Sequence, residues 1–321
     1  MTAISIKSIL PLFKSTFSEF NENNSFRLAG ALAFNAIFSI PPLLIIIIRV
    51  AGAFFGEKAV SGQLSDQIGS AIGPSAAEGI ETVLKNAQVS EGGGIALWIG
   101  IGTLIFAATT FFATLQESLN SVWNLKVKPS NGIVKMLQVR VFSFGIVLSI
   151  ALLMLLSLVI SAVIAILSDF LAQLIPGVGV FFIKLADFVV SVGIITALFA
   201  LIYKYLPDAT IRWKDIWIGA FVTALLFTIG KFLISWHIGT SDPGSAYGAA
   251  GSIIVILVWI YYSSLIVFFG AEFTQQYALQ LGQNIRPKPH AVFVREQEVT
   301  EQPQDKKSGR PKPEGRFNKN P

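Results

Sequence analysis

The sequence predicts an all-α membrane protein with six transmembrane helices, and three observations carry that prediction. Apolar residues make up 53% of the 321 residues and charged residues 13%, too few to cover a soluble globule of this size. Long uncharged runs recur, and the run from Gly251 to Ala271 is long enough to cross a hydrocarbon layer of about 30 Å. Lysine and arginine gather in alternate connecting segments, as they do in multi-pass membrane proteins.

Residues 1–27 are the first predicted element, an amphipathic helix. Apolar side chains recur there every three or four residues among charged ones, at Ile6, Ile9, Leu10, Phe13, Phe17 and Phe20. We expect this helix to lie at the membrane surface or to pack against the helical bundle.

The first membrane span is expected from Leu28 to about Ala53, and it contains the pair Pro41 and Pro42. Proline removes a backbone donor and clashes with the preceding turn, so the helix should kink or break at this pair. A packing kink between neighbouring helices is one interpretation. The other is a discontinuous helix that coordinates substrate, as in many transporters.

The other spans follow the remaining uncharged runs, at residues 94–115, 141–167, 181–203, 216–238 and 251–271. Residues 54–93 separate the first two spans and carry two sets of apolar residues at helical spacing. We expect two short amphipathic helices there, forming a helical outer loop. The six spans make up one membrane domain, residues 28–282.

Residues 283–321 are rich in proline, lysine, arginine and glutamate and predict a disordered basic tail. With both termini in the cytoplasm, all lysines and arginines of the connecting segments and the tail fall on the cytoplasmic side, except Lys58 and Lys85. The positive-inside rule therefore predicts cytoplasmic N- and C-termini. The same distribution explains the net charge of +5 without a nucleic-acid partner.

The composition offers few thiol or imidazole side chains that could bind a metal or a cofactor. The chain has no cysteine, which excludes disulfides, thiolate metal sites and thiol nucleophiles. Its two histidines, His237 and His290, have no partner at the spacing of a metal or catalytic motif. We therefore expect no cofactor, no metal and no enzymatic activity.

Four segments together resemble the YihY/virulence factor BrkB family. They are AFNAIFSIPP from Ala33, FFATLQESLNSVW from Phe111, the Trp213–Lys231 segment with its Gly219-Ala220 pair, and the WIYYSS and GAEFT groups from Trp259 and Gly270. The resemblance covers roughly residues 20–282. It implies a six-helix protein of the bacterial inner membrane. Members of that family carry an old ribonuclease label, a virulence label and proposals as transporters of lipids or small solutes.

Cations within the predicted spans suggest a substrate site. Arg49, Lys184 and Lys231 are expected toward the outer side, with Asp187 one helical turn from Lys184. We predict that they line an outward-facing pocket for an anionic headgroup, a phosphate or a carboxylate. The alternative is that these long side chains snorkel to the outer interface.

Two carboxylates at the other side predict an inner gate. Glu117 and Glu272 end the second and sixth spans, where they would balance basic residues such as Arg27 or Lys204. Trp259 and Tyr262 are weaker candidates for lining the same path. Helix packing, with the hydroxyl groups bonded to neighbouring backbone, is the alternative interpretation for these aromatic residues.

The function predicted from the sequence is transport, or transfer between leaflets, of an anionic and lipid-like substrate, with membrane lipids as the partners. Two alternatives stay open. One is a scaffold for envelope assembly, and the other is a membrane-bound ribonuclease. Small residues such as Ala220 and Ala224 would permit the close helix contacts of a homo-oligomer.

Overall fold

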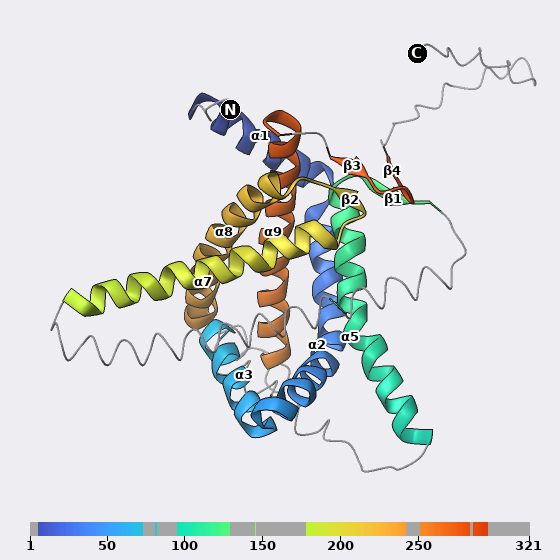
Figure 1. Cartoon of the computed structure of the whole chain (residues 1–321), viewed down its shortest axis with the longest axis vertical. Helices are drawn as coiled ribbons and strands as arrows, with labels where there is room; N and C mark the ends of the chain where they lie inside the picture. The colour runs from blue at the N-terminus through green and yellow to red at the C-terminus, as the bar shows by residue number, and fades with distance from the viewer. Residues whose placement is uncertain are drawn as a thin grey trace, which may run out of the picture.

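The computed structural model describes residues 6–72, 81, 95–128, 145, 178–241, 251–282 and 285–294. Helices dominate this part of the chain, and four short strands lie at one end (Figure 1). The elements are α1 (Ile6–Glu22), α2 (Ser25–Phe55), α3 (Glu57–Ile72), α5 (Ile95–Val122), β1 (Leu125–Val127), α7 (Val178–Tyr205), β2 (Ala209–Thr210), α8 (Trp213–Ser241), α9 (Gly251–Gln280), β3 (Arg286–Pro287) and β4 (Ala291–Phe293).

Within the described residues, four helices contain segments that are long and apolar enough to cross a membrane. These segments are Ser25–Ile45, Phe188–Tyr205, Trp213–His237 and Ile253–Gln280. They correspond to the first, fourth, fifth and sixth predicted spans. The second predicted span is helical within α5, and the third, 141–167, lies outside the described residues apart from Gly145.

Helix α2 continues from Ser25 to Phe55 through Pro41 and Pro42, so the described backbone has no break at the pair. Its ribbon changes direction along its length (Figure 1). Proline kinks a helix without ending it when neighbouring elements hold both halves. Here α5 and α9 pack along α2, and α3 packs against it after the turn at Gly56.

Helix α9 runs through the middle of the bundle, in contact with α1, α2, α5 and α8 (Figure 1). Its approach to α8 is close because glycine faces threonine twice. Gly219 of α8 lies against Thr274, and Gly270 of α9 lies against Thr223. Small residues let helix backbones approach closely, which is the usual basis of helix packing in membranes.

The outer surface of the bundle is apolar. Large side chains such as Phe34, Phe38, Phe232 and Trp236 are exposed on α2 and α8. A soluble protein rarely leaves so many aromatic side chains in water. This surface suits hydrocarbon and agrees with the membrane spans assigned above.

The predicted amphipathic helix is present as α1, and it packs against the bundle. Leu12 is buried against Phe273 and Tyr277 of α9, and the ring of Phe20 lies 5.7 Å from that of Phe269. The opposite side of α1 exposes Leu10 and Phe17. Of the two predicted helices in the outer loop, the first is α3, and the second lies outside the described residues apart from Glu81.

The predicted start of the disordered tail, residue 283, is wrong. Strand β4 pairs with β1, and β3 pairs with β2, both antiparallel. Ile285 and Ala291 are buried. Backbone pairing with distant segments orders this stretch although its composition is polar and rich in proline, and residues 295–321 lie outside the described part of the chain.

Candidate functional site

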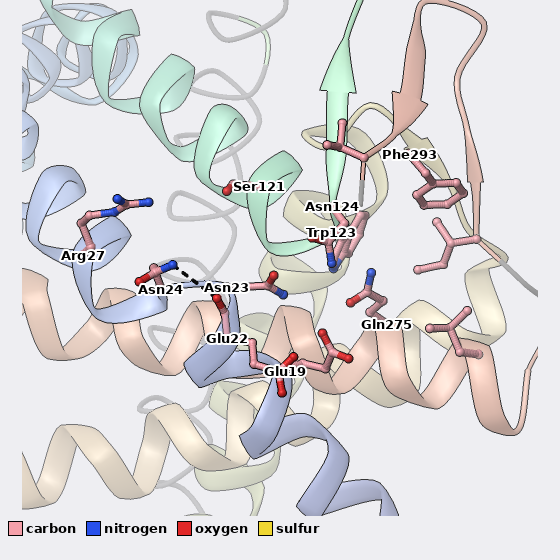
Figure 2. Close-up of a pocket in the computed structure, with 13 residues that line it drawn as sticks. Glu19, Glu22, Asn23, Asn24, Arg27, Ser121, Trp123, Asn124, Gln275 and Phe293 are labelled. Atoms are coloured by element: carbon pink, nitrogen blue, oxygen red, sulfur yellow. Dashed lines mark hydrogen bonds between the residues drawn. The ribbon is translucent and has the colours of Figure 1, made fainter. Parts of the chain in front are cut away.

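A cavity of about 580 Å³ opens at the end of the bundle that carries α1 and the strands (Figure 2). The α1–α2 turn, the C-terminal ends of α5 and α9, and β4 surround it. One part of its lining is polar and includes Glu19, Glu22, Asn23, Asn24 and Arg27. The other part is apolar, with Trp123, Leu279, Ile285, Phe293 and Val294. We call this feature the α1–α2 cavity.

The α1–α2 turn positions the polar part of the lining. The backbone N–H of Asn23 donates to the Glu19 carbonyl at 2.8 Å and closes α1. Asn24 adopts the left-handed conformation, with φ 53°, which asparagine tolerates better than most residues. The chain therefore changes direction within two residues, and α2 begins beside the end of α1.

Asn23 joins three helices at the cavity. Its amide Nδ2 donates to Glu272 Oε1 of α9 at 2.6 Å and to the Val122 carbonyl at the end of α5 at 3.0 Å. The indole of Trp123 adds a second link between these elements, since its Nε1 donates to the Ala271 carbonyl at 3.0 Å. The α1–α2 turn, α5 and α9 are thus held together by polar contacts around Glu272.

Glu272 is a carboxyl group in the interior. Its side chain is 0% exposed, and its Oε2 accepts no hydrogen bond from the described residues. The carboxylates of Glu19 and Glu22 lie near enough to interact with its charge. A buried carboxylate is costly unless a cation or enough donors satisfy it, so Glu272 retains an acceptor for a further group.

Gln275 lies one turn beyond Glu272 on α9 and lines the cavity (Figure 2). Its side chain is only 6% exposed, and its Oε1 accepts no hydrogen bond from the described part of the chain. Residues three apart share one side of a helix. Gln275 in the cavity wall and the buried Glu272 one turn before it therefore each carry an oxygen that accepts no hydrogen bond from the described residues.

The pKa of Glu19 reflects the electrostatic environment of the cavity. Burial, and then the neighbouring charge of Glu22, raise the pKa of its carboxyl group above 4.5. Both causes disfavour a second negative charge at this position. The surroundings of Glu19 are therefore electronegative and partly shielded from water.

A second polar cluster lies where the segment after α7 meets α5 and the C-terminal strands, and we call it the Asp208 clasp. Asp208 is buried and accepts from Asn120 Nδ2 at 2.8 Å and from Gln116 Nε2 at 3.4 Å. The imidazole of His290 lies 2.7 Å from its other oxygen. The clasp fastens the segment after α7 and the C-terminal strands to α5.

The predicted outward-facing pocket is described only in part. Arg49, Lys184 and Asp187 lie in α2 and α7, and their side chains fall outside the described part of the structure. Lys231 is half-buried on α8. The joint role of these residues stays a prediction.

The two predicted gate carboxylates occupy different environments. Glu117 is exposed on α5, whereas Glu272 is completely buried. The hydrogen bond to Glu272 comes from the Asn23 amide. Lys204, the predicted counterion, donates to the Ile211 carbonyl and lies 5.5 Å from the centre of the Trp213 ring. Arg27 lines the α1–α2 cavity.

The two aromatic candidates also differ. Trp259 is buried in an apolar cluster with Ile234 and Val255. Tyr262 is exposed and lines an open groove of about 390 Å³ together with His237. Trp259 is therefore packed within the apolar core, whereas Tyr262 lies in an open groove.

Sequence reasoning missed Asn23, Gln275 and the Asp208 clasp. None of these residues matches a motif, and uncharged polar residues are ordinary at helix ends. One signal was present, the polar run Gln116, Glu117, Ser118 and Asn120 at the end of an apolar helix. Among the described residues, no group of three or more histidine, aspartate or glutamate side chains is arranged to hold a metal ion.

A comparison with protein families tests the family resemblance of the four sequence segments. The family model of the virulence factor BrkB matches residues 16–294. The chain belongs to the virulence factor BrkB family. The matched range contains the four membrane spans of the described residues, the α1–α2 cavity and the C-terminal strands, so these are parts of the family domain.

Similar proteins are named only as membrane proteins. A UPF0761 membrane protein of Haemophilus influenzae (strain 86-028NP) is 29% identical over 278 residues, covering 84% of this BrkB-family chain and 94% of the relative. One from Psychromonas ingrahamii is 31% identical over 257 residues, covering 77% and 80%. No solved structure matches the chain significantly. These names support an integral membrane protein and specify no activity.

Proposed function

We propose that this BrkB-family protein transfers a phosphate-bearing, lipid-like molecule across the membrane or between its leaflets, and that the α1–α2 cavity holds the polar end of that molecule. The observation that carries the proposal is the two-sided lining. Glu19, Asn23 and Arg27 offer charge and hydrogen bonds, while Leu279 and Phe293 offer apolar surface. A lipid headgroup with the first part of its acyl chains needs both.

The anionic part of the substrate would meet cations. Arg27 lines the cavity, and a guanidinium binds phosphate with two parallel hydrogen bonds. Arg49, Lys184 and Lys231 are the predicted cations of the opposite half of the bundle, where they would receive the same phosphate after transfer. Their role follows from the sequence alone and belongs to this proposal.

The location proposed is the bacterial inner membrane, with the α1–α2 cavity on the cytoplasmic side. Support comes from the basic residues at this end. Lys126 lies in β1, and Arg286 and Lys288 lie in or next to β3, all in segments that the sequence analysis assigned to the cytoplasm. Substrate would therefore enter from the cytoplasmic leaflet.

A transfer role suits the described site better than ribonuclease chemistry does. His290 contacts Asp208 within the clasp, and His237 lies on α8 beside the open groove. A nuclease that uses general acid and base catalysis needs two such groups converging on one phosphate. The two histidines are placed in separate parts of the fold, so we propose that the protein is not an enzyme.

The test is transfer of lipid in vesicles that contain the full chain. Phosphatidylglycerol and phosphatidylethanolamine, each with a fluorescent label on one acyl chain, are followed by dithionite bleaching of the outer leaflet. We expect faster transfer than in protein-free vesicles. Ser121→Trp should slow it, because Ser121 lies at the cavity with an exposed side chain and a large ring there would occupy part of the space.

The matched control is Thr103→Trp, which places the same ring on the same helix at an exposed position outside the cavity lining. This variant should transfer lipid like the unmodified protein. Equal transfer in protein-containing and empty vesicles would overturn the proposal. So would full activity of Ser121→Trp.

A further inference from the structure

Acceptors dominate one region of the α1–α2 cavity. Glu19 and Glu22 supply carboxylate oxygens to its wall, and Gln275 supplies an amide oxygen that accepts no hydrogen bond within the described chain. The nearest amide donor, Asn23 Nδ2, is already used by Glu272 and the Val122 carbonyl. A ligand that fits this region must therefore bring its own donors.

The charged residues of the cavity also favour a ligand with a positive group near Gln275 and Glu19. Glu19 and Glu22 line the cavity, and Glu272 is buried within reach of their fields. Arg27 is the guanidinium of the lining, and Figure 2 shows it apart from Gln275 and Glu19. The region around Gln275 and Glu19 is thus negative, while the region around Arg27 is positive.

This cavity wall differs from an ordinary acidic surface because Gln275 contributes a buried acceptor without a donor among the described residues. Glutamate side chains on a surface are satisfied by water and need no ligand. Gln275 is nine-tenths buried, and its free Oε1 belongs to a side chain of the cavity wall (Figure 2). A buried acceptor without a donor costs about 1–3 kcal/mol, so a donating ligand would remove that penalty.

We propose that the region of Glu19, Gln275 and Glu272 binds a primary ammonium group. A primary ammonium carries three N–H donors and a positive charge, which match a neutral acceptor beside carboxylates. A quaternary ammonium has the charge and lacks the donors. The inference rests on the proposed function for the nature of the carrier, a phosphate-bearing lipid whose headgroup ends in a primary amine, with its phosphate toward Arg27.

Equilibrium binding tests this inference without requiring transfer. The purified full chain in detergent is titrated with dihexanoyl forms of phosphatidylethanolamine, phosphatidylcholine and phosphatidylglycerol, and binding is followed by calorimetry. These probes share acyl chains and phosphate and differ in the terminal group. We expect the ethanolamine form to bind at least about tenfold more tightly than the others, the difference expected for one hydrogen bond to a charged group.

Three variants locate the site. Glu19→Gln keeps side-chain shape and removes charge, Glu272→Gln keeps side-chain shape and removes the carboxyl group, and Gln275→Leu removes the free acceptor. Each should reduce the preference for the ethanolamine form at least about fivefold, again the scale of one charge-assisted hydrogen bond. Asp66→Asn removes an exposed carboxylate from α3 and should leave the preference unchanged. Glu19 is only partly buried, so Glu19→Gln remains informative if substitution of the buried Glu272 impairs folding.

Free ethanolamine is a further probe, which distinguishes a soluble amine from a lipid headgroup. Binding of ethanolamine that matches the short-chain lipid in strength and in sensitivity to the variants would support the ammonium site and assign a soluble amine as its source. Equal binding of all three lipids, or loss of preference in Asp66→Asn alone, would overturn the inference. Transfer without ammonium preference would leave the proposed function intact, and ammonium binding without transfer would leave only the binding site.

Discussion

Asn120 and Asp208 are joined by two reciprocal hydrogen bonds. The Asn120 amide Nδ2 donates to Asp208 Oδ2 at 2.8 Å, and the backbone N–H of Asp208 donates to Asn120 Oδ1, also at 2.8 Å. Both side chains are buried. The pair therefore fixes the segment after α7 against the end of α5, at the point where the C-terminal strands dock.

We expect Asp208→Ala to destabilise the protein. The change leaves the buried amide of Asn120 without its acceptor and removes the contact with His290. An unsatisfied buried donor costs about 1–3 kcal/mol, which should appear as a lower midpoint of thermal unfolding in detergent. Asp66→Ala, at an exposed position of α3, is the control. Similar midpoints for the two variants would contradict the role of the clasp.

Truncation should separate the contribution of the docked strands from that of residues 295–321. A chain that ends after Val294 keeps β3 and β4, buried Ile285 and Ala291, and the bond from Lys288 Nζ to the Pro207 carbonyl at 2.8 Å. Its unfolding midpoint should equal that of the full chain. A chain that ends after residue 284 loses these contacts and should unfold at a lower temperature. Equal midpoints of the two truncated chains would mean that the strands contribute nothing to stability.

Gly219→Ala should destabilise the contact between α8 and α9. An added Cβ would lie 2.7 Å from the Thr274 Cβ and closer still to its hydroxyl oxygen. Overpacking of this kind costs about 1–3 kcal/mol, measurable as loss of the folded state in a denaturant titration. The double variant Gly219→Ala with Thr274→Gly moves the side chain across the contact and should recover most of the loss.

Gly62→Ala is the control for that substitution, because the space around an added Cβ is open and the residue lies within α3. Alanine is a better helix former than glycine, so a neutral or slightly stabilising effect is expected. If the double variant were as unstable as Gly219→Ala, the threonine contact would not be the cause.

Binding of the primary ammonium should weaken as the pH falls. The pKa of Glu19 is raised by burial and by Glu22, so its negative charge is complete only above that raised pKa and disappears as the pH falls through it. The carboxyl groups near Glu19 are Glu22 on α1 and Glu272 on α9, and Arg27 on α2 lines the same cavity apart from Glu19. Titration with dihexanoyl phosphatidylethanolamine from about pH 7.5 to about pH 5 measures the effect.

The raised pKa of Glu19 also makes the stability of the folded protein depend on pH. A carboxyl group with a raised pKa in the folded state holds its proton more tightly there than in the unfolded chain, so its contribution to stability increases as the pH falls through the folded value. Glu19→Gln should reduce both pH effects, because it removes one of the carboxyl groups of this region. Binding that stays constant across this range in the unmodified protein would contradict a role for Glu19.

Membrane orientation can be measured directly because the chain contains no cysteine. Single cysteines are introduced at Lys58 and Lys126, which are both exposed. The positive-inside rule places Lys58 outside and Lys126 in the cytoplasm. A maleimide that cannot cross the membrane should label Lys58→Cys in intact spheroplasts and Lys126→Cys only after permeabilisation. The opposite pattern would reverse the proposed direction of entry.

The sequence by itself determined the class of the protein and most of its long helices. Hydropathy is a local property, and a backbone in hydrocarbon must satisfy its own hydrogen bonds, so an apolar run such as 251–271 leads to a helix whatever its neighbours are. Amphipathic spacing likewise located α1. The same local reasoning misjudged the segment 285–294, whose order depends on partners elsewhere in the chain.

Only the tertiary structure decided which polar groups meet. Asn23 and Glu272 are 249 positions apart, and Asn120 and Asp208 are 88 positions apart. Neither pair has a spacing that a motif would reveal, because hydrogen bonds between helices depend on which helix ends share one end of the bundle. Polar groups in an apolar interior must find partners wherever packing brings them together, and that packing is set by the whole chain.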